Sequence, residues 1–69
     1  MNQRESILKF MDDFGSISPF EAFTELGITK LATRVSELIR DGVKIQKKPE
    51  SRRNRYGRKV TYVRYSRQV

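Results

Sequence analysis

Apolar residues in the first part of the chain recur with the period of a helix. One helical face is marked by the spacing i, i+1, i+4, i+7 of Ile7, Leu8, Met11 and Phe14. Gly15 follows as a stop signal, and Asn2 with Glu5 could form a capping box at the start. The pattern predicts a first helix over about residues 4–13.

The start of a second helix is marked by three separate signals. Ser18 is a good N-cap, Pro19 suits the first helical position, and Glu21 stands three residues after the cap. One apolar face is formed by Phe20, Phe23 and Leu26. Gly27 then ends a helix predicted over about residues 19–26.

A third helix follows almost at once, with Thr29 as its expected N-cap. Its buried face is predicted from the periodic set Leu31, Val35, Leu38 and Ile39. The stop signal at Asp41 and Gly42 places this helix at about residues 30–41. Two helices joined by so short a turn must cross steeply to share one core, which is helix-turn-helix geometry.

After Gly42 the apolar period changes to two, as expected for strands. Val43 and Ile45 alternate with polar residues, and a second alternating stretch covers residues 60–65. Residues 49–59 are polar and basic and have the composition of a loop at the tip of an antiparallel hairpin. The short link at Ser16 and Ile17 could add a third, edge strand.

Length and charge narrow the class of function. The 69 residues allow one domain, residues 1–69, with a small core. The net charge of +7 is uneven, because residues 1–43 hold five basic and seven acidic residues while residues 44–69 hold ten basic and one acidic. Like charge gathered this way repels itself, so a polyanionic partner is expected and a membrane surface fits less well.

The residue types argue against catalysis. Without His or Cys, the usual general base, thiol nucleophile and soft metal ligands are missing, so we expect no enzyme, no metal and no cofactor. No small-molecule ligand is evident. The chain also lacks an apolar run of the roughly 18 residues that span a membrane. Together with the absence of Cys, this favours a cytoplasmic protein.

The order of helix, helix, tight turn, helix and basic hairpin resembles the winged helix-turn-helix family, an α+β fold of three helices and a C-terminal β-hairpin wing. Residues 15–45 look more narrowly like small helix-turn-helix proteins of phages and prophages. The positions that match that pattern are Leu31, Arg34, Val35, Glu37, Leu38 and Gly42. The resemblance implies that the third helix enters the major groove and that the wing, residues 43–66, lies on the backbone or minor groove.

The outward side of the third helix carries the candidates for base reading. On the helical projection, and because the N-terminal half of a recognition helix reaches base edges, these are Thr29, Lys30, Thr33, Arg34 and Arg40. An alternative for Arg34 is an ion pair with Glu37, or a contact that holds Asp41 near the helix end. Glu37 itself is expected to be a structural partner, because phosphates repel it.

The wing carries the candidates for the DNA backbone and minor groove. They are Lys47, Lys48, Arg52, Arg53, Arg55, Tyr56, Arg58 and Lys59. Tyr56 lies among the cations, where it could pack on a sugar or stack on a base. The other aromatic residues with helical spacing are expected in the core: Phe10, Phe14, Phe20 and Phe23.

These observations predict a sequence-specific protein for double-stranded DNA, either a phage or prophage transcriptional regulator or an architectural factor. Two alternatives stay open. Arginine-rich loops also suit RNA and ribonucleoproteins, and a small phage protein could inhibit a host protein through its basic surface. A homodimer on two half-sites is plausible, since one small module gives limited affinity.

Overall fold

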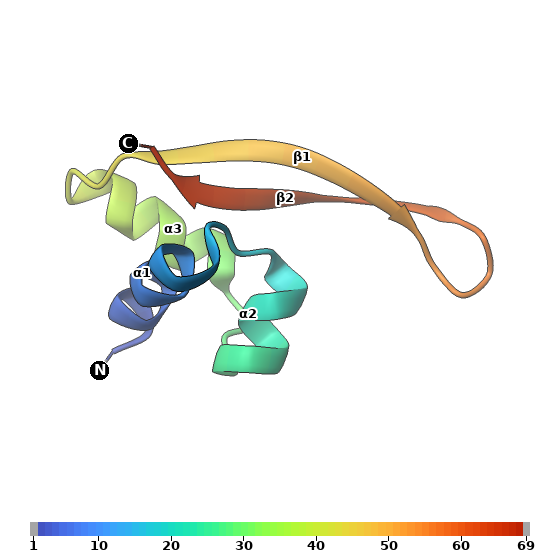
Figure 1. Ribbon diagram of the computed structural model, residues 1–69, viewed down its shortest axis with the longest axis horizontal. Coiled ribbons are helices and arrows are strands. Elements are labelled where there is room, and N and C mark those ends of the chain that lie inside the picture. The colour runs from blue at the N-terminus through green and yellow to red at the C-terminus, as the bar shows by residue number, and fades with distance from the viewer. Residues whose placement is uncertain (1, 69) are drawn as a thin grey trace.

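The computed structural model describes residues 2–68, in which three helices precede one antiparallel hairpin (Figure 1). The elements in chain order are α1 (Gln3–Phe14), α2 (Pro19–Leu26), α3 (Leu31–Arg40), β1 (Ile45–Arg53) and β2 (Lys59–Arg67). All three predicted helices are present, each within about one residue of its expected ends. This is the α+β arrangement that the sequence predicted.

The signals at the helix ends act as expected in α2, whereas in α1 only the Asn2 half of the expected capping box is present among the described residues. The Ser18 hydroxyl accepts from the Glu21 backbone N–H at 3.2 Å, and the Glu21 carboxylate accepts from the Ser18 N–H at 2.9 Å, which completes the capping box. At the start of α1 the Asn2 side chain accepts from the Glu5 N–H at 2.8 Å. Gly27, with φ 69°, takes the left-handed conformation that ends α2.

The prediction that Thr29 is the N-cap of the third helix was wrong. Lys30 occupies the N-cap of α3, and its side chain makes no capping hydrogen bond. The turn between α2 and α3 is held by Ile28, whose side chain is buried and whose N–H donates to the Ala22 carbonyl at 2.9 Å. Burial of Ile28 therefore sets the helix start, and Thr29 lies exposed in the turn.

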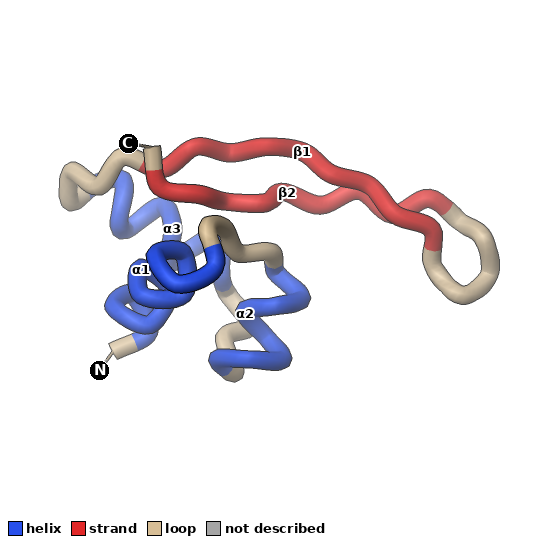
Figure 2. The backbone as a smooth tube through the Cα atoms, viewed as in Figure 1, coloured by secondary structure: helices blue, strands red, loops and turns tan. Residues whose placement is uncertain are grey.

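The two strands of the hairpin are longer than their composition suggested. The register pairs Ile45 with Arg67 and Arg53 with Lys59, so only residues 54–58 form the turn (Figure 2). The prediction of a loop over residues 49–59 was therefore wrong for residues 49–53 and for Lys59, which belong to the strands. Pro49 lies within β1, opposite Val63. A two-stranded sheet tolerates this because each strand has an outer edge where a proline needs no hydrogen bond.

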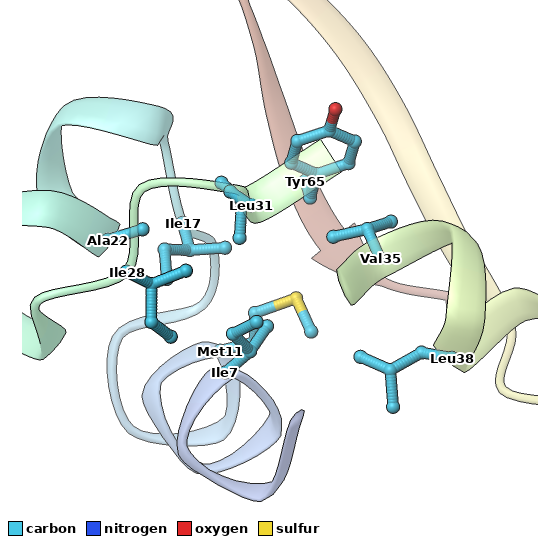
Figure 3. Packing of buried hydrophobic residues seen from close by; sticks show 9 residues of the cluster. All are labelled: Ile7, Met11, Ile17, Ala22, Ile28, Leu31, Val35, Leu38 and Tyr65. Atoms are coloured by element: carbon cyan, nitrogen blue, oxygen red, sulfur yellow. The ribbon is translucent and has the colours of Figure 1, made fainter. Parts of the chain in front are cut away.

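The base of the hairpin is fixed to the helices through β2. Ile17 forms a bridge with Tyr65, in which the two backbone N–H groups donate to the opposite carbonyls at 2.8 and 2.9 Å. The expected third strand is thus present as a single bridge. Figure 3 shows the core that this bridge closes, formed by Ile7, Met11, Ile17, Ala22, Ile28, Leu31, Val35, Leu38 and Tyr65.

The expectation that the phenylalanines lie in the core was wrong for three of four. The side chains of Phe14, Phe20 and Phe23 are 72%, 66% and 59% exposed. Only Phe10 packs partly against the core. The face that α2 turns inward carries Ala22, whose small side chain lets the short helix approach closely. Ile39 of α3 was also expected to be buried, but it is exposed, and the buried residues of α3 are Leu31, Val35 and Leu38.

Candidate nucleic-acid interface

The cations predicted to grip phosphates lie along β1 and around the hairpin turn. They are Lys47, Lys48, Arg52, Arg53, Arg55, Arg58 and Lys59, and all are exposed. Among the described residues, none of them has a nitrogen within 4.0 Å of a carboxylate oxygen. Their charges are therefore unneutralised within the described chain and available to an external polyanion.

The hairpin turn is ordered by its own hydrogen bonds. The Asn54 Oδ1 atom accepts from the N–H groups of Tyr56 and Arg58, both at 3.0 Å. The Arg53 guanidinium donates to the Gly57 carbonyl at 2.8 Å, and Gly57 has φ 77°. Tyr56 is 86% exposed at this tip. The tip thus presents an aromatic ring between cations on a turn that is defined by its own hydrogen bonds.

Two other arginines of the hairpin bind the protein's own carboxylates. Arg64 pairs with Glu21 and Glu50, and Arg67 pairs with Asp12 at 3.2 Å. The hydrogen bond from Arg64, helped by one from Tyr62, lowers the pKa of Glu50 below its ordinary value. The hydrogen bond to Glu50 in turn raises the pKa of Arg64. These two arginines connect the hairpin to the helices and are not free for a partner.

The turn before α3 and the surface of α3 together carry four exposed candidates for base reading. Thr29, Lys30, Thr33 and Arg40 are exposed. Lys30 and Arg40 have no carboxylate oxygen within 4.0 Å among residues 2–68. These side chains are free to reach a groove.

Arg34 is held differently from the other candidates. Its Nη1 atom donates to both carboxylate oxygens of Glu37, at 3.0 and 2.9 Å, and its Nε atom donates to the Gln3 side chain at 3.0 Å. The alternative of an Arg34–Glu37 pair is present, whereas Asp41 pairs with Arg4. Arg34 must therefore give up these hydrogen bonds before it can reach a base.

Besides Ile39, two exposed residues of α3 were not among the candidates. Ala32 and Ser36 lie on the surface, and Ser36 is one turn from Thr33 and from Arg40. Small and hydroxyl side chains can contact thymine methyl groups or base edges. Helical spacing could have revealed Ser36, since it lies on the face opposite Leu31, Val35 and Leu38.

A cleft of about 650 Å³ separates α2 from the distal part of the hairpin. Its α2 wall is formed by Ser18, Phe20, Glu21, Thr24 and Glu25. Its hairpin wall is formed by Arg52, Arg53, Asn54, Arg55, Val60, Tyr62 and Arg64. Glu21 is neutralised by Arg64, but Glu25 has no cationic nitrogen within 4.0 Å among the described residues. The cleft is therefore cationic on one side and carries a carboxylate on the other.

The predicted residues fall into two separate surfaces. Figure 1 shows the hairpin projecting past α2, so that its tip lies away from α3 along the long axis of the molecule, which measures 39 Å. A partner that contacts both surfaces must be extended.

Within residues 2–68 no group of three or more His, Cys, Asp or Glu side chains is arranged to hold a metal ion. None of the helices described has the length and apolarity to cross a membrane.

Comparison with known proteins gives one match. The family model described as a winged helix-turn-helix domain matches residues 2–66. This match covers all three helices and nearly the whole hairpin, and a domain of this kind indicates binding to nucleic acid. No curated protein and no solved structure matches the chain.

Proposed function

This chain belongs to the winged helix-turn-helix family, and from that membership we propose that it binds double-stranded DNA in a sequence-specific manner. In this proposal α3 enters the major groove and the hairpin, which corresponds to the wing, lies on the backbone or in the minor groove. The role is that of a transcriptional regulator or architectural factor of phage or prophage type. No catalytic step is part of it.

The observation that carries the proposal is the division of the cations. Arg64 and Arg67 are paired with carboxylates of the helices, whereas the cations of β1 and the tip are exposed and unpaired within the described chain. Unneutralised cations on an extended arm gain most from a polyanion with regularly spaced charges. A duplex is also extended enough to meet the arm and α3 together.

The two surfaces have different tasks in the proposal. Contacts from the wing to phosphates and sugars supply affinity and fix the register, but they carry little sequence information. The exposed residues of α3 supply base contacts. We therefore expect strong, salt-sensitive binding with a smaller sequence-dependent part.

Selection of bound fragments from random duplex DNA tests the proposal directly. Enrichment of one sequence motif supports it. Salt titrations on duplex DNA, duplex RNA and single strands then compare the nucleic acids, and preference for RNA would replace DNA as the partner. If no nucleic acid binds below roughly 10⁻⁴ M at physiological salt, which is weaker than ordinary non-specific binding, inhibition of a host protein becomes the better explanation.

The wing has its own test with a matched control. Replacing Arg52, Arg53 and Arg55 with Ala should reduce the slope of log K against log salt by roughly 0.9 for each phosphate that the protein no longer neutralises. The control replaces Arg4, Lys9 and Arg67 with Ala, which removes the same charge from residues that pair with carboxylates. Equal slopes for the two triple variants would remove the wing from the proposal.

Sedimentation of the complex counts the copies of the protein on each duplex and so tests the proposed homodimer.

A further inference from the structure

The hairpin beyond its base is an arm with a single polar attachment to the helices. Tyr65 is buried in the core and bridges to Ile17, which fixes the base. Outward from there, residues 51–61 are exposed. Among the described residues, no hydrogen bond or ion pair joins the hairpin to the helices farther out than Arg64.

The Arg64 guanidinium contacts three separate parts of the fold. Its Nη1 atom donates to the Glu21 carboxylate of α2 at 2.8 Å and to the Ser16 hydroxyl of the link before α2 at 3.1 Å. Its Nε atom donates to the Glu50 carboxylate of β1 at 3.0 Å. One planar group thus joins both strands of the hairpin to the start of the helix-turn-helix.

Both carboxylate acceptors of Arg64 are themselves held in place. The Glu21 oxygen that binds Arg64 also accepts from the Ser18 N–H at 2.9 Å, as part of the α2 capping box. The Glu50 oxygen also accepts from the Tyr62 hydroxyl at 3.0 Å. The side chains of Arg64, Glu21 and Glu50 are 25%, 37% and 33% exposed, so water competes with these contacts only in part. The orientation of the arm is therefore tied to the first turn of α2.

We propose that Arg64 is a positioning residue, whose contacts with Glu21, Ser16 and Glu50 hold the distal hairpin at a fixed angle to α3 so that both surfaces meet one duplex together. This inference rests on the proposed binding of DNA. Two surfaces held at the right spacing bind as one unit, because the second contact forms at a high effective concentration. An arm that swings about its base loses part of that gain, although every contact residue is still present.

The affinity test is a double-mutant cycle. Arg64→Met removes the guanidinium and keeps much of the side-chain length. It should weaken duplex binding about tenfold, a fraction of the roughly 100-fold or larger gain that linked contacts give. With Arg52, Arg53 and Arg55 already replaced by Ala, the same change should cost less than about twofold, because the arm then has little left to position. Equal reductions in affinity in the two backgrounds would overturn the proposal.

Arg67→Met is the matched control. It removes the same charge from the same strand, but its partner Asp12 lies on α1 and the neighbouring base is already held by the core. Its effect should be the same in both backgrounds. If it reproduced the non-additive result of Arg64→Met, the effect would belong to hairpin charge in general and the proposal would fall. Glu21→Gln weakens the acceptor on α2 and keeps a side chain that can complete the capping box, so it supplies a second variant should Arg64→Met fold poorly; its effect on affinity should also shrink in the Ala background.

A measurement without DNA tests the geometry alone. Residual dipolar couplings of the backbone N–H groups of residues 51–61 and of the three helices should fit one alignment tensor in the wild-type protein and in Arg67→Met. In Arg64→Met and Glu21→Gln the distal residues should need a tensor of their own. A single tensor in all four proteins would overturn the positioning role, whereas absence of DNA binding with altered couplings would overturn the proposed function alone.

Discussion

The guanidinium of Arg34 donates to both carboxylate oxygens of Glu37, one turn later on α3, at 3.0 and 2.9 Å. The two side chains are 32% and 31% exposed. The pair lies on the side of α3 next to Gln3, at the start of α1, and not on the most exposed side of the helix. Arg34, whose guanidinium could donate two hydrogen bonds to guanine, is thus hydrogen-bonded to Glu37 in the free protein.

The Arg34–Glu37 pair should contribute little to stability. We expect a coupling free energy of about 0.5 kcal/mol from a cycle of Arg34→Ala, Glu37→Ala and the double variant, because pairs at this spacing on a helix surface give values of that size. Urea denaturation measures it. The coupling should decrease in high salt, and a value above about 2 kcal/mol would mean that the pair is a structural element of the core.

Lys30 should contribute more to sequence discrimination than Arg34. Lys30 is exposed and unpaired within residues 2–68, whereas Arg34 must first leave Glu37 and Gln3. We expect Lys30→Ala to reduce the ratio of affinities for the selected and a random duplex by about tenfold, within the range of roughly 1–3 kcal/mol for a good base contact. Fluorescence anisotropy with the two duplexes measures the ratio. A larger reduction for Arg34→Ala would reverse this order.

Glu25 should weaken non-specific binding. Glu25 lines the cleft whose other wall is the cationic hairpin, and its carboxylate has no described cation within 4.0 Å. A phosphate strand that approaches this cleft is repelled by it, so Glu25→Gln should tighten binding to random duplex at low salt by about twofold to fivefold, the effect of roughly 0.5–1 kcal/mol between screened charges.

The control for Glu25 is Glu5→Gln on α1. It changes the net charge equally and also concerns an exposed carboxylate without a described ion pair. Its effect should be smaller than that of Glu25→Gln. Identical effects would indicate that only net charge matters and that strands do not pass near the cleft.

The contact between Glu50 and Arg64 should depend on pH at the acidic end. Because the pKa of Glu50 is lowered below its ordinary value of 4.5, its contribution is fully present above that unfolded value. The contribution disappears as the pH falls through the lower, folded pKa. A carboxyl ¹³C NMR titration should give a midpoint for Glu50 below 4.5, and Arg64→Met should move it upward. A midpoint unchanged by Arg64→Met would contradict the contact as its cause.

The tip of the hairpin should become disordered when Asn54 is replaced. Asn54→Ala removes the acceptor of the Tyr56 and Arg58 N–H groups, whereas Asn54→Asp keeps it. We expect lower heteronuclear NOE values at residues 55–57 in the Ala variant only. Affinity for a duplex should fall about twofold to fivefold, since the tip must then be ordered on binding. Equal NOE values in the two variants would show that the strands alone order the turn.

Much of the fold could be predicted from local signals in the amino-acid sequence. The Ser18 and Glu21 capping box, the glycine stops and the apolar periods act over a few residues, so they fixed the helices nearly to the residue. The alternation near Tyr65 similarly indicated a strand, and the excess of cations after Val43 indicated a polyanionic partner. These signals are local, and local signals can be read from one sequence.

The length of the two strands was missed because the distal part of the hairpin has the composition of a loop. Residues 49–53 are polar, with a proline, yet they pair as a strand since each has a partner in β2 that extends the register set at the base. The phenylalanines were misplaced for a related reason. Helical spacing shows that Phe20 and Phe23 share a side of α2, but only packing decides that Ala22 faces the core.

The sequence by itself thus determined which elements form and that the C-terminal part is strongly cationic. The tertiary structure decided which cations are available. Arg52 and Arg64 carry the same charge in the sequence, but Arg64 forms ion pairs with Glu21 and Glu50, whereas Arg52 has no carboxylate oxygen within 4.0 Å among the described residues. The reason is physical: the charge of a residue belongs to its type, whereas neutralisation depends on distances of about 3–4 Å between residues far apart in the chain.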